Sequence, residues 1–66
     1  MIKFRIRVTK SRRQPVWVRR VDDHKYLVTS DRLQAQLFGK LEAEDHLDII
    51  RVNAGWGASL EPVHDV

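Results

Sequence analysis

The 66-residue sequence predicts an α+β domain, in which a small, mainly antiparallel sheet is covered on one face by a helix. Residues 2–8 alternate apolar and basic side chains, which is the period of a strand with one buried face. Apolar side chains in residues 41–54 instead fall close to one stripe, the pattern of an amphipathic helix. Because a sheet with one apolar face needs a cover, we expect a single domain over residues 1–66 with the order βββ-α-β.

The first half of the chain is predicted to form three strands in a meander. The first strand covers residues 2–8, and the second runs over residues 15–21, since proline is tolerated at the first position of a strand. Asp22 and Asp23 then favour a turn, because a short carboxylate side chain bonds nearby backbone N–H groups. The segment KYLVT at residues 25–29 follows as the third strand.

The second half of the chain is predicted to supply the helical cover. Ser30 or Asp31 can cap a short segment near residues 31–36, and a longer helix is expected near residues 41–53. Gly39 separates the two patterns, so two segments are preferred to one straight helix. One continuous helix remains the alternative, because a glycine inside a helix costs only about 1 kcal/mol.

A last short strand is expected around Leu60 and Val63, and Pro62 places it at an edge of the sheet. Gly55 stands where a left-handed helix cap is expected. The apolar sheet face and the helix stripe together give the predicted core: Ile2, Phe4, Ile6, Val8, Val16, Val18, Leu41, Ala43, Leu47 and Ile50.

Charge is distributed unevenly along the chain. The net charge is +3, yet residues 1–21 hold eight Lys or Arg and no acid, whereas residues 22–66 hold four basic and nine acidic side chains. The two parts therefore carry +8 and −5. Such polarity can steer an anionic partner toward one end of the molecule, or it can be satisfied within the monomer or between two copies.

The basic residues of the first strand define a candidate nucleic-acid surface. If Val16 and Val18 face the core, alternation places Trp17 outward, and a base can stack on it while phosphates are neutralised alongside. An ordinary solvated sheet face, with Trp17 packed on the aliphatic stems of the basic side chains, explains the same residues. If Trp17 instead faces inward, the stacking surface is lost. The candidate residues are Lys3, Arg5, Arg7, Trp17 and Arg19, with Arg12 and Arg13 of the following loop at the rim.

No pattern in the sequence predicts an enzyme, a cofactor or a metal site. The hydroxyl residues sit in no triad or elbow motif, and the glycines are too scattered for a nucleotide fingerprint. His24, His46 and His64 lack metal-ligand spacing and are interpreted as surface residues.

The compartment follows from what the composition lacks. The absence of cysteine excludes a disulfide framework and favours a reducing, cytoplasmic setting. No apolar run approaches the roughly 20 residues that cross a bilayer, and no apolar leader precedes the first strand, so we expect no membrane partner.

The stretch WVRRVDDHKYLVTSDRLQAQLFGKLEAEDHL combines a hairpin containing Trp and basic residues, an Ala-x-x-Phe segment and an acidic helix. This layout resembles small uncharacterised proteins carried by bacteriophages and prophages. The resemblance implies binding to a host protein or to nucleic acid.

The sequence supports two hypotheses of function. The first is a small non-enzymatic module that binds an unidentified protein partner, or itself as a homodimer, because a sheet edge can pair with another strand. The alternative is a nucleic-acid-binding domain that uses the basic sheet face around Trp17.

Overall fold

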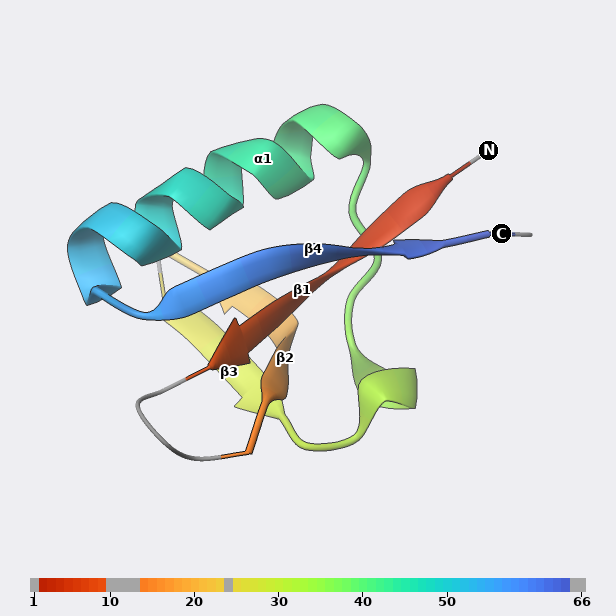
Figure 1. Ribbon diagram of the computed structural model, residues 1–66, viewed down its shortest axis with the longest axis horizontal. Coiled ribbons are helices and arrows are strands. Elements are labelled where there is room, and N and C mark those ends of the chain that lie inside the picture. The colour runs from red at the N-terminus through yellow and green to blue at the C-terminus, as the bar shows by residue number, and fades with distance from the viewer. Residues whose placement is uncertain (1, 10–13, 24, 65–66) are drawn as a thin grey trace.

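The computed structural model describes residues 2–9, 14–23 and 25–64 (Figure 1). It confirms the predicted fold class: an antiparallel sheet packs one face against a helix. Arg12, Arg13 and His24 lie outside the described residues. The elements are β1 (Lys3–Thr9), β2 (Val16–Asp22), β3 (Lys25–Thr29), the 3₁₀ turn η1 (Arg32–Gln34), α1 (Lys40–Ile49), the π-helical turn η2 (Ile50–Ala54) and β4 (Gly57–Val63).

The strands lie in the order β3-β2-β1-β4, and all neighbours are antiparallel. β1 pairs with β4 along its whole length, from Lys3 opposite Val63 to Thr9 opposite Gly57. The β1–β2 register joins Arg7 with Trp17 and Val8 with Val16. Pro62 therefore lies in an edge strand, as predicted, although β4 is longer than the sequence pattern indicates.

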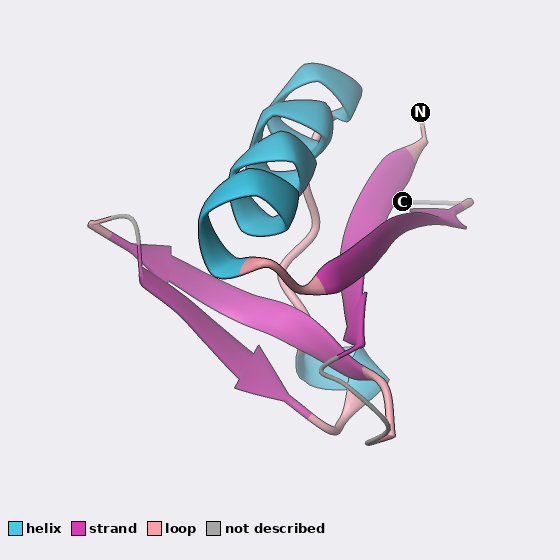
Figure 2. Cartoon of the chain, turned by 60° about the vertical axis from the view of Figure 1, so that its left-hand side comes forward, coloured by secondary structure: helices cyan, strands magenta, loops and turns pink. Residues whose placement is uncertain are grey.

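The chain crosses the sheet where β1 and β2 diverge. Phe38 and Phe4 exchange two backbone hydrogen bonds, of 2.8 and 2.9 Å, and the Gln36 N–H donates to the Val18 carbonyl at 3.0 Å. Residues 36–38 thus bridge β1 and β2, with η1 on one side of the sheet and α1 on the other (Figure 2). We call the face covered by α1 the inner face and the opposite one the outer face.

The core lies between the inner face and α1. Ile6, Val8 and Val18 are fully buried, as their strand alternation predicts, and Ala43 and Ile50 meet them from the helical side. Phe38 completes the buried set: the crossing segment carries it into the core, whereas sequence periodicity left it out. Phe4, Val16 and Leu47 pack around this cluster.

Two residues of the predicted core are not in it. Leu41 is 77% exposed because it precedes Ala43 by two positions, which places it about 200° around the helix from the buried face. Ile2 is 49% exposed because it precedes Lys3, the first residue paired with β4.

The helical region is interrupted at Gly39, as predicted. Asp31 accepts a hydrogen bond from the Leu33 N–H at 3.0 Å and so caps η1, which is a single 3₁₀ turn shorter than the predicted segment. Gly39 is the N-cap of α1. Gly55 adopts a φ of 68°, the left-handed conformation that ends η2 and that glycine adopts without a steric cost.

Candidate functional site

Trp17 lies on the outer face. Val18 is fully buried and Val16 packs on the core, so alternation along β2 turns Trp17 away from α1, with Arg7 opposite it on β1. The same alternation along β1 places Lys3, Arg5 and Arg7 on this face. The register that the nucleic-acid hypothesis requires for Trp17 is therefore the observed one.

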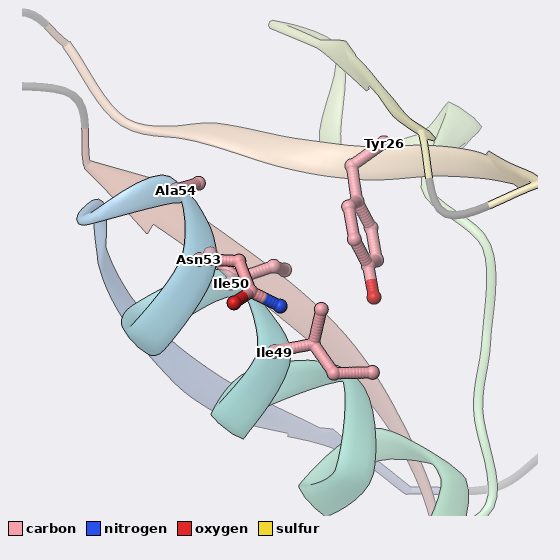
Figure 3. Close-up of a pocket in the computed structure, with 5 residues that line it drawn as sticks. All are labelled: Tyr26, Ile49, Ile50, Asn53 and Ala54. Carbon is pink, nitrogen blue, oxygen red and sulfur yellow. The ribbon is translucent and has the colours of Figure 1, made fainter.

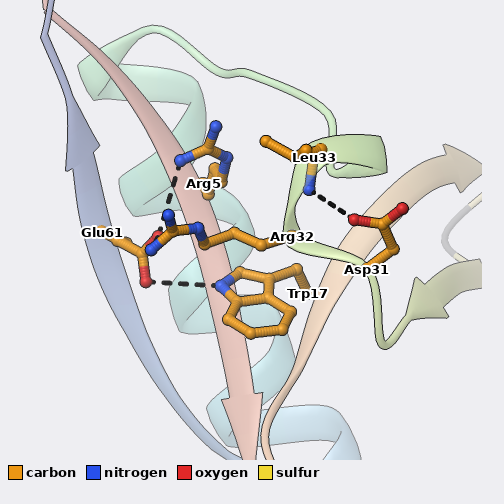
Figure 4. A network of polar contacts seen from close by, with 6 residues as sticks. All are labelled: Arg5, Trp17, Asp31, Arg32, Leu33 and Glu61. Carbon is orange, nitrogen blue, oxygen red and sulfur yellow. Dashed lines mark hydrogen bonds and ion pairs between the residues drawn. The ribbon is translucent and has the colours of Figure 1, made fainter.

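The centre of this basic row contains an acid that sequence reasoning did not include. Glu61 lies opposite Arg5, and its Oε1 is 3.6 Å from Nη1 of Arg5 and 3.7 Å from Nη1 of Arg32. Its Oε2 accepts a hydrogen bond from the Trp17 indole at 3.4 Å. Arg5, Trp17, Arg32 and Glu61 form what we call the Glu61 cluster (Figure 4).

The Glu61 cluster joins β1, β2, β4 and η1. The Arg5 side chain is only 16% exposed, and both its Nε and Oε1 of Glu61 are buried without a hydrogen bond among the described residues. Attraction between the opposite charges is therefore what holds this pair. Two of the candidate nucleic-acid residues, Arg5 and Trp17, are engaged with an internal carboxylate.

Arg19 lies apart from the basic row, at a β-bulge. The β2–β3 register passes from Val18 opposite Val28 to Arg20 opposite Leu27, so Arg19 is the additional residue of the bulge. Arg19 and Arg20 are both exposed. Together with Leu27 and Val28 they line a pocket of about 390 Å³, which we call the arginine pocket.

The two edge strands of the sheet differ in how they are protected. On β4, Pro62 lacks an N–H, and the Arg51 guanidinium donates to the Ala58 carbonyl at 2.7 and 3.2 Å. β3 contains no proline, and no strand in the described part of the chain pairs with its outer edge. Leu27, at the centre of β3, is 50% exposed. β3 is thus the edge more open to another strand.

A second pocket lies on the inner side of β3. Its volume is about 450 Å³, and Tyr26 of β3 faces the end of the helical region across it (Figure 3). We call it the tyrosine pocket; its lining residues are Tyr26, Ile49, Ile50, Asn53 and Ala54. Three of these come from the π-helical turn η2, a distortion that occurs frequently at functional sites.

Tyr26 is fixed in place by His46. The Tyr26 hydroxyl lies 2.9 Å from Nδ1 of His46, and the His46 ring makes edge contacts with Tyr26 and Phe38 at centroid distances of 5.5 and 5.2 Å. The interpretation of His46 as a surface residue is therefore wrong: it is half-buried, because it lies on the side of α1 that faces β3. Burial raises the pKa of Tyr26 above its usual value of 10.0.

Protein-family models, curated proteins and solved structures give no match to this chain. Within residues 2–9, 14–23 and 25–64, no group of three His, Asp or Glu side chains is placed to hold a metal ion. Among those same residues, no helix has the length and apolarity to span a membrane.

Proposed function

We propose that this protein is a non-enzymatic protein-interaction module that binds an extended segment of another protein as an additional strand along β3. The observation that carries the proposal is an open edge strand with a pocket on each side: the tyrosine pocket at Tyr26 and the arginine pocket at Leu27.

Strand addition uses both the open edge of β3 and the two pockets beside it. An edge strand offers unpaired backbone N–H and C=O groups, which hydrogen-bond to the main chain of the incoming segment and supply affinity. Alternate side chains of that segment point to opposite faces, so they enter the two pockets in turn and supply specificity. Tyr26 and Leu27 are consecutive and carry one pocket each, which matches this alternation.

The nucleic-acid alternative has less support. Its central residues, Arg5 and Trp17, contact Glu61, whose negative charge lies where a phosphate would bind. The protein proposal places the partner in the cytoplasm, because the chain has no cysteine. The resemblance of residues 17–47 to phage and prophage proteins supports a host protein as that partner.

The proposal is tested by selecting random heptapeptides on the intact protein and titrating the selected peptides into ¹⁵N-labelled protein. We expect amide shifts at residues 25–29 and 49–54. Peptides that shift only the outer face of β1 and β4, or a library that gives no binder, would overturn the proposal.

A matched pair of variants tests the tyrosine pocket. Asn53 lines the pocket, whereas its neighbour Val52 is 79% exposed and lies outside the lining set. Asn53→Trp should fill the pocket and lower the affinity of the selected peptides at least about tenfold, which corresponds to about 1.4 kcal/mol of binding free energy. Val52→Trp should leave their affinity unchanged. Equal affinities of the two variants would exclude this pocket from the binding site.

A further inference from the structure

Given the proposed strand addition, we infer the chemistry of the segment that binds: an aliphatic side chain enters the tyrosine pocket, and the adjacent residue presents a carboxylate to Arg19 and Arg20. The ligand is thus an acidic–aliphatic alternating segment of another protein. This inference rests on the proposed function and adds the class of partner.

The order of the two positions follows from strand geometry. In an antiparallel or parallel pair, residues opposite one another lie on the same face. The residue opposite Tyr26 therefore faces α1, and its neighbour opposite Leu27 faces outward toward the bulge. Consecutive residues of the ligand consequently meet the two different pockets.

The tyrosine pocket selects an aliphatic side chain. Ile49, Ile50 and Ala54 give it apolar walls, and Tyr26 is the only ionisable group among the described residues that line it. The Tyr26 hydroxyl is already engaged by His46. A charged ligand side chain entering here would lose water without gaining a counter-ion, which is unfavourable.

The arginine pocket selects a carboxylate. The bulge places two consecutive arginines, Arg19 and Arg20, in the lining of one pocket beside the middle of β3, and neither forms an ion pair with a described residue. A guanidinium binds a carboxylate through paired hydrogen bonds. Lys25 adds positive charge at the start of β3, while the acids of this hairpin, Asp22 and Asp23, lie at its turn, with Asp22 opposite Lys25.

A second copy of this chain fits the site less well. If two β3 strands paired, the incoming segment would be KYLVT, which contains a lysine and no acid. The arginines of both copies would then remain without counter-ions. Charge complementarity therefore favours a different, acidic protein.

Two synthetic peptides test the inference: a valine–glutamate alternating heptapeptide and its valine–lysine counterpart, each titrated into the ¹⁵N-labelled full chain at low salt. We expect the glutamate peptide to shift the amides of β3 and to bind about five- to tenfold more tightly, as two partly exposed ion pairs allow. The preference should shrink in 0.5 M NaCl, because salt screens exposed pairs.

Charge-reversal variants test which arginines or lysines cause the preference for the glutamate peptide. Arg19→Glu combined with Arg20→Glu should reverse the preference between the peptides. Lys3→Glu combined with Arg7→Glu changes the net charge equally on the outer face but away from β3, and should leave the preference for glutamate in place. If both double variants lose the preference for the glutamate peptide to the same extent, the preference is a general charge effect and the assigned site is overturned.

The outcomes separate the inference from the proposed function. If library-selected peptides bind β3 but the glutamate and lysine peptides bind equally or not at all, the acidic–aliphatic inference fails and strand addition stands. If no peptide of any kind shifts β3, both fail. Dimerisation through β3, detected by sedimentation and by β3 amide shifts that depend on protein concentration, would replace the acidic ligand with a second copy.

Strand pairing itself is tested on the peptide. Alternate residues of an added strand direct their N–H groups toward the same side, so N-methylation of one alternate set should abolish binding, while N-methylation of the other set should not. If both N-methylated peptides still bind, the peptide lies in the pockets without pairing to β3.

Discussion

The hydroxyl of Tyr26 lies 2.9 Å from Nδ1 of His46, a bond that joins the edge strand β3 to α1 across 20 residues of sequence. It connects the element proposed to bind a partner with the helix that covers the sheet. The wall of the tyrosine pocket is therefore held by a specific polar contact as well as by apolar packing.

Tyr26→Phe should destabilise the protein by about 1 kcal/mol, the net value of a typical hydrogen bond, while the ring contacts are kept. Urea denaturation measures the change. A double-mutant cycle with His46→Leu should give a coupling of about 0.5 kcal/mol or more. Additive effects of the two substitutions would mean that the bond contributes nothing to stability.

Ionisation of Tyr26 should occur above pH 10 in the folded protein. The chain has a single tyrosine, so the absorbance of tyrosinate near 295 nm reports this residue alone. Burial raises the pKa of Tyr26 in the folded protein above 10.0. The contribution of protonated Tyr26 to folding stability is therefore complete below pH 10.0 and is lost as the pH rises through the pKa of the folded state. A folded midpoint at or below that of the urea-unfolded chain would contradict the burial argument.

Leu41 and Leu47 allow the same substitution to be compared on the two sides of α1. Leu47→Ala should cost about 1–2 kcal/mol, at or below the lower end of values for buried leucines, because Leu47 is only partly buried against the core. Leu41→Ala should change stability by less than about 0.5 kcal/mol. Thermal and urea unfolding of the two variants would test the assignment of the buried helix face; similar losses would refute it.

Glu61→Gln should destabilise the protein by about 1–3 kcal/mol, because it leaves the largely buried Arg5 without a counter-charge while keeping an oxygen for Trp17. Glu44→Gln makes the same charge change at an exposed helix position and should be nearly neutral. Equal stabilities of the two variants would show that the Glu61 cluster does not hold the outer face together.

Oligonucleotide binding distinguishes the two functional hypotheses. If the protein proposal is correct, labelled single-stranded and duplex DNA should not bind below about 100 μM, even at low salt. Binding below that concentration, reduced by Trp17→Ala and with a salt slope lowered by about one unit in Arg5→Ala, would instead favour the nucleic-acid alternative. Fluorescence anisotropy at two salt concentrations gives both quantities.

Local signals predicted most of the elements. Alternation identified β1, the segment KYLVT coincides with β3, and Gly55 adopts the expected left-handed cap. Asp31 caps η1, as its side-chain chemistry indicates. In each case the determining interactions lie within a few residues, so the sequence pattern contains the information.

The candidate site was less predictable because it depends on register between distant segments. Glu61 reaches Arg5 only because β4 pairs with β1 in one particular alignment, and no local pattern in either strand specifies it. The bulge at Arg19 likewise appears only in the β2–β3 register. The predicted helical stripe also included Leu41, which a rotation of 100° per residue from Ala43 places on the exposed side of the helix.

The pairing of β1 with β4 has a consequence for how the chain folds. Every residue from Lys3 to Thr9 is aligned with β4, whereas the β1–β2 ladder joins only Arg7 and Val8 among the described residues. The first strand therefore gains most of its backbone partners from residues more than 45 positions later, so a large loop must close before those bonds form. The sheet is completed by its most distant segments, which favours slow, cooperative assembly over stepwise growth from the N-terminus.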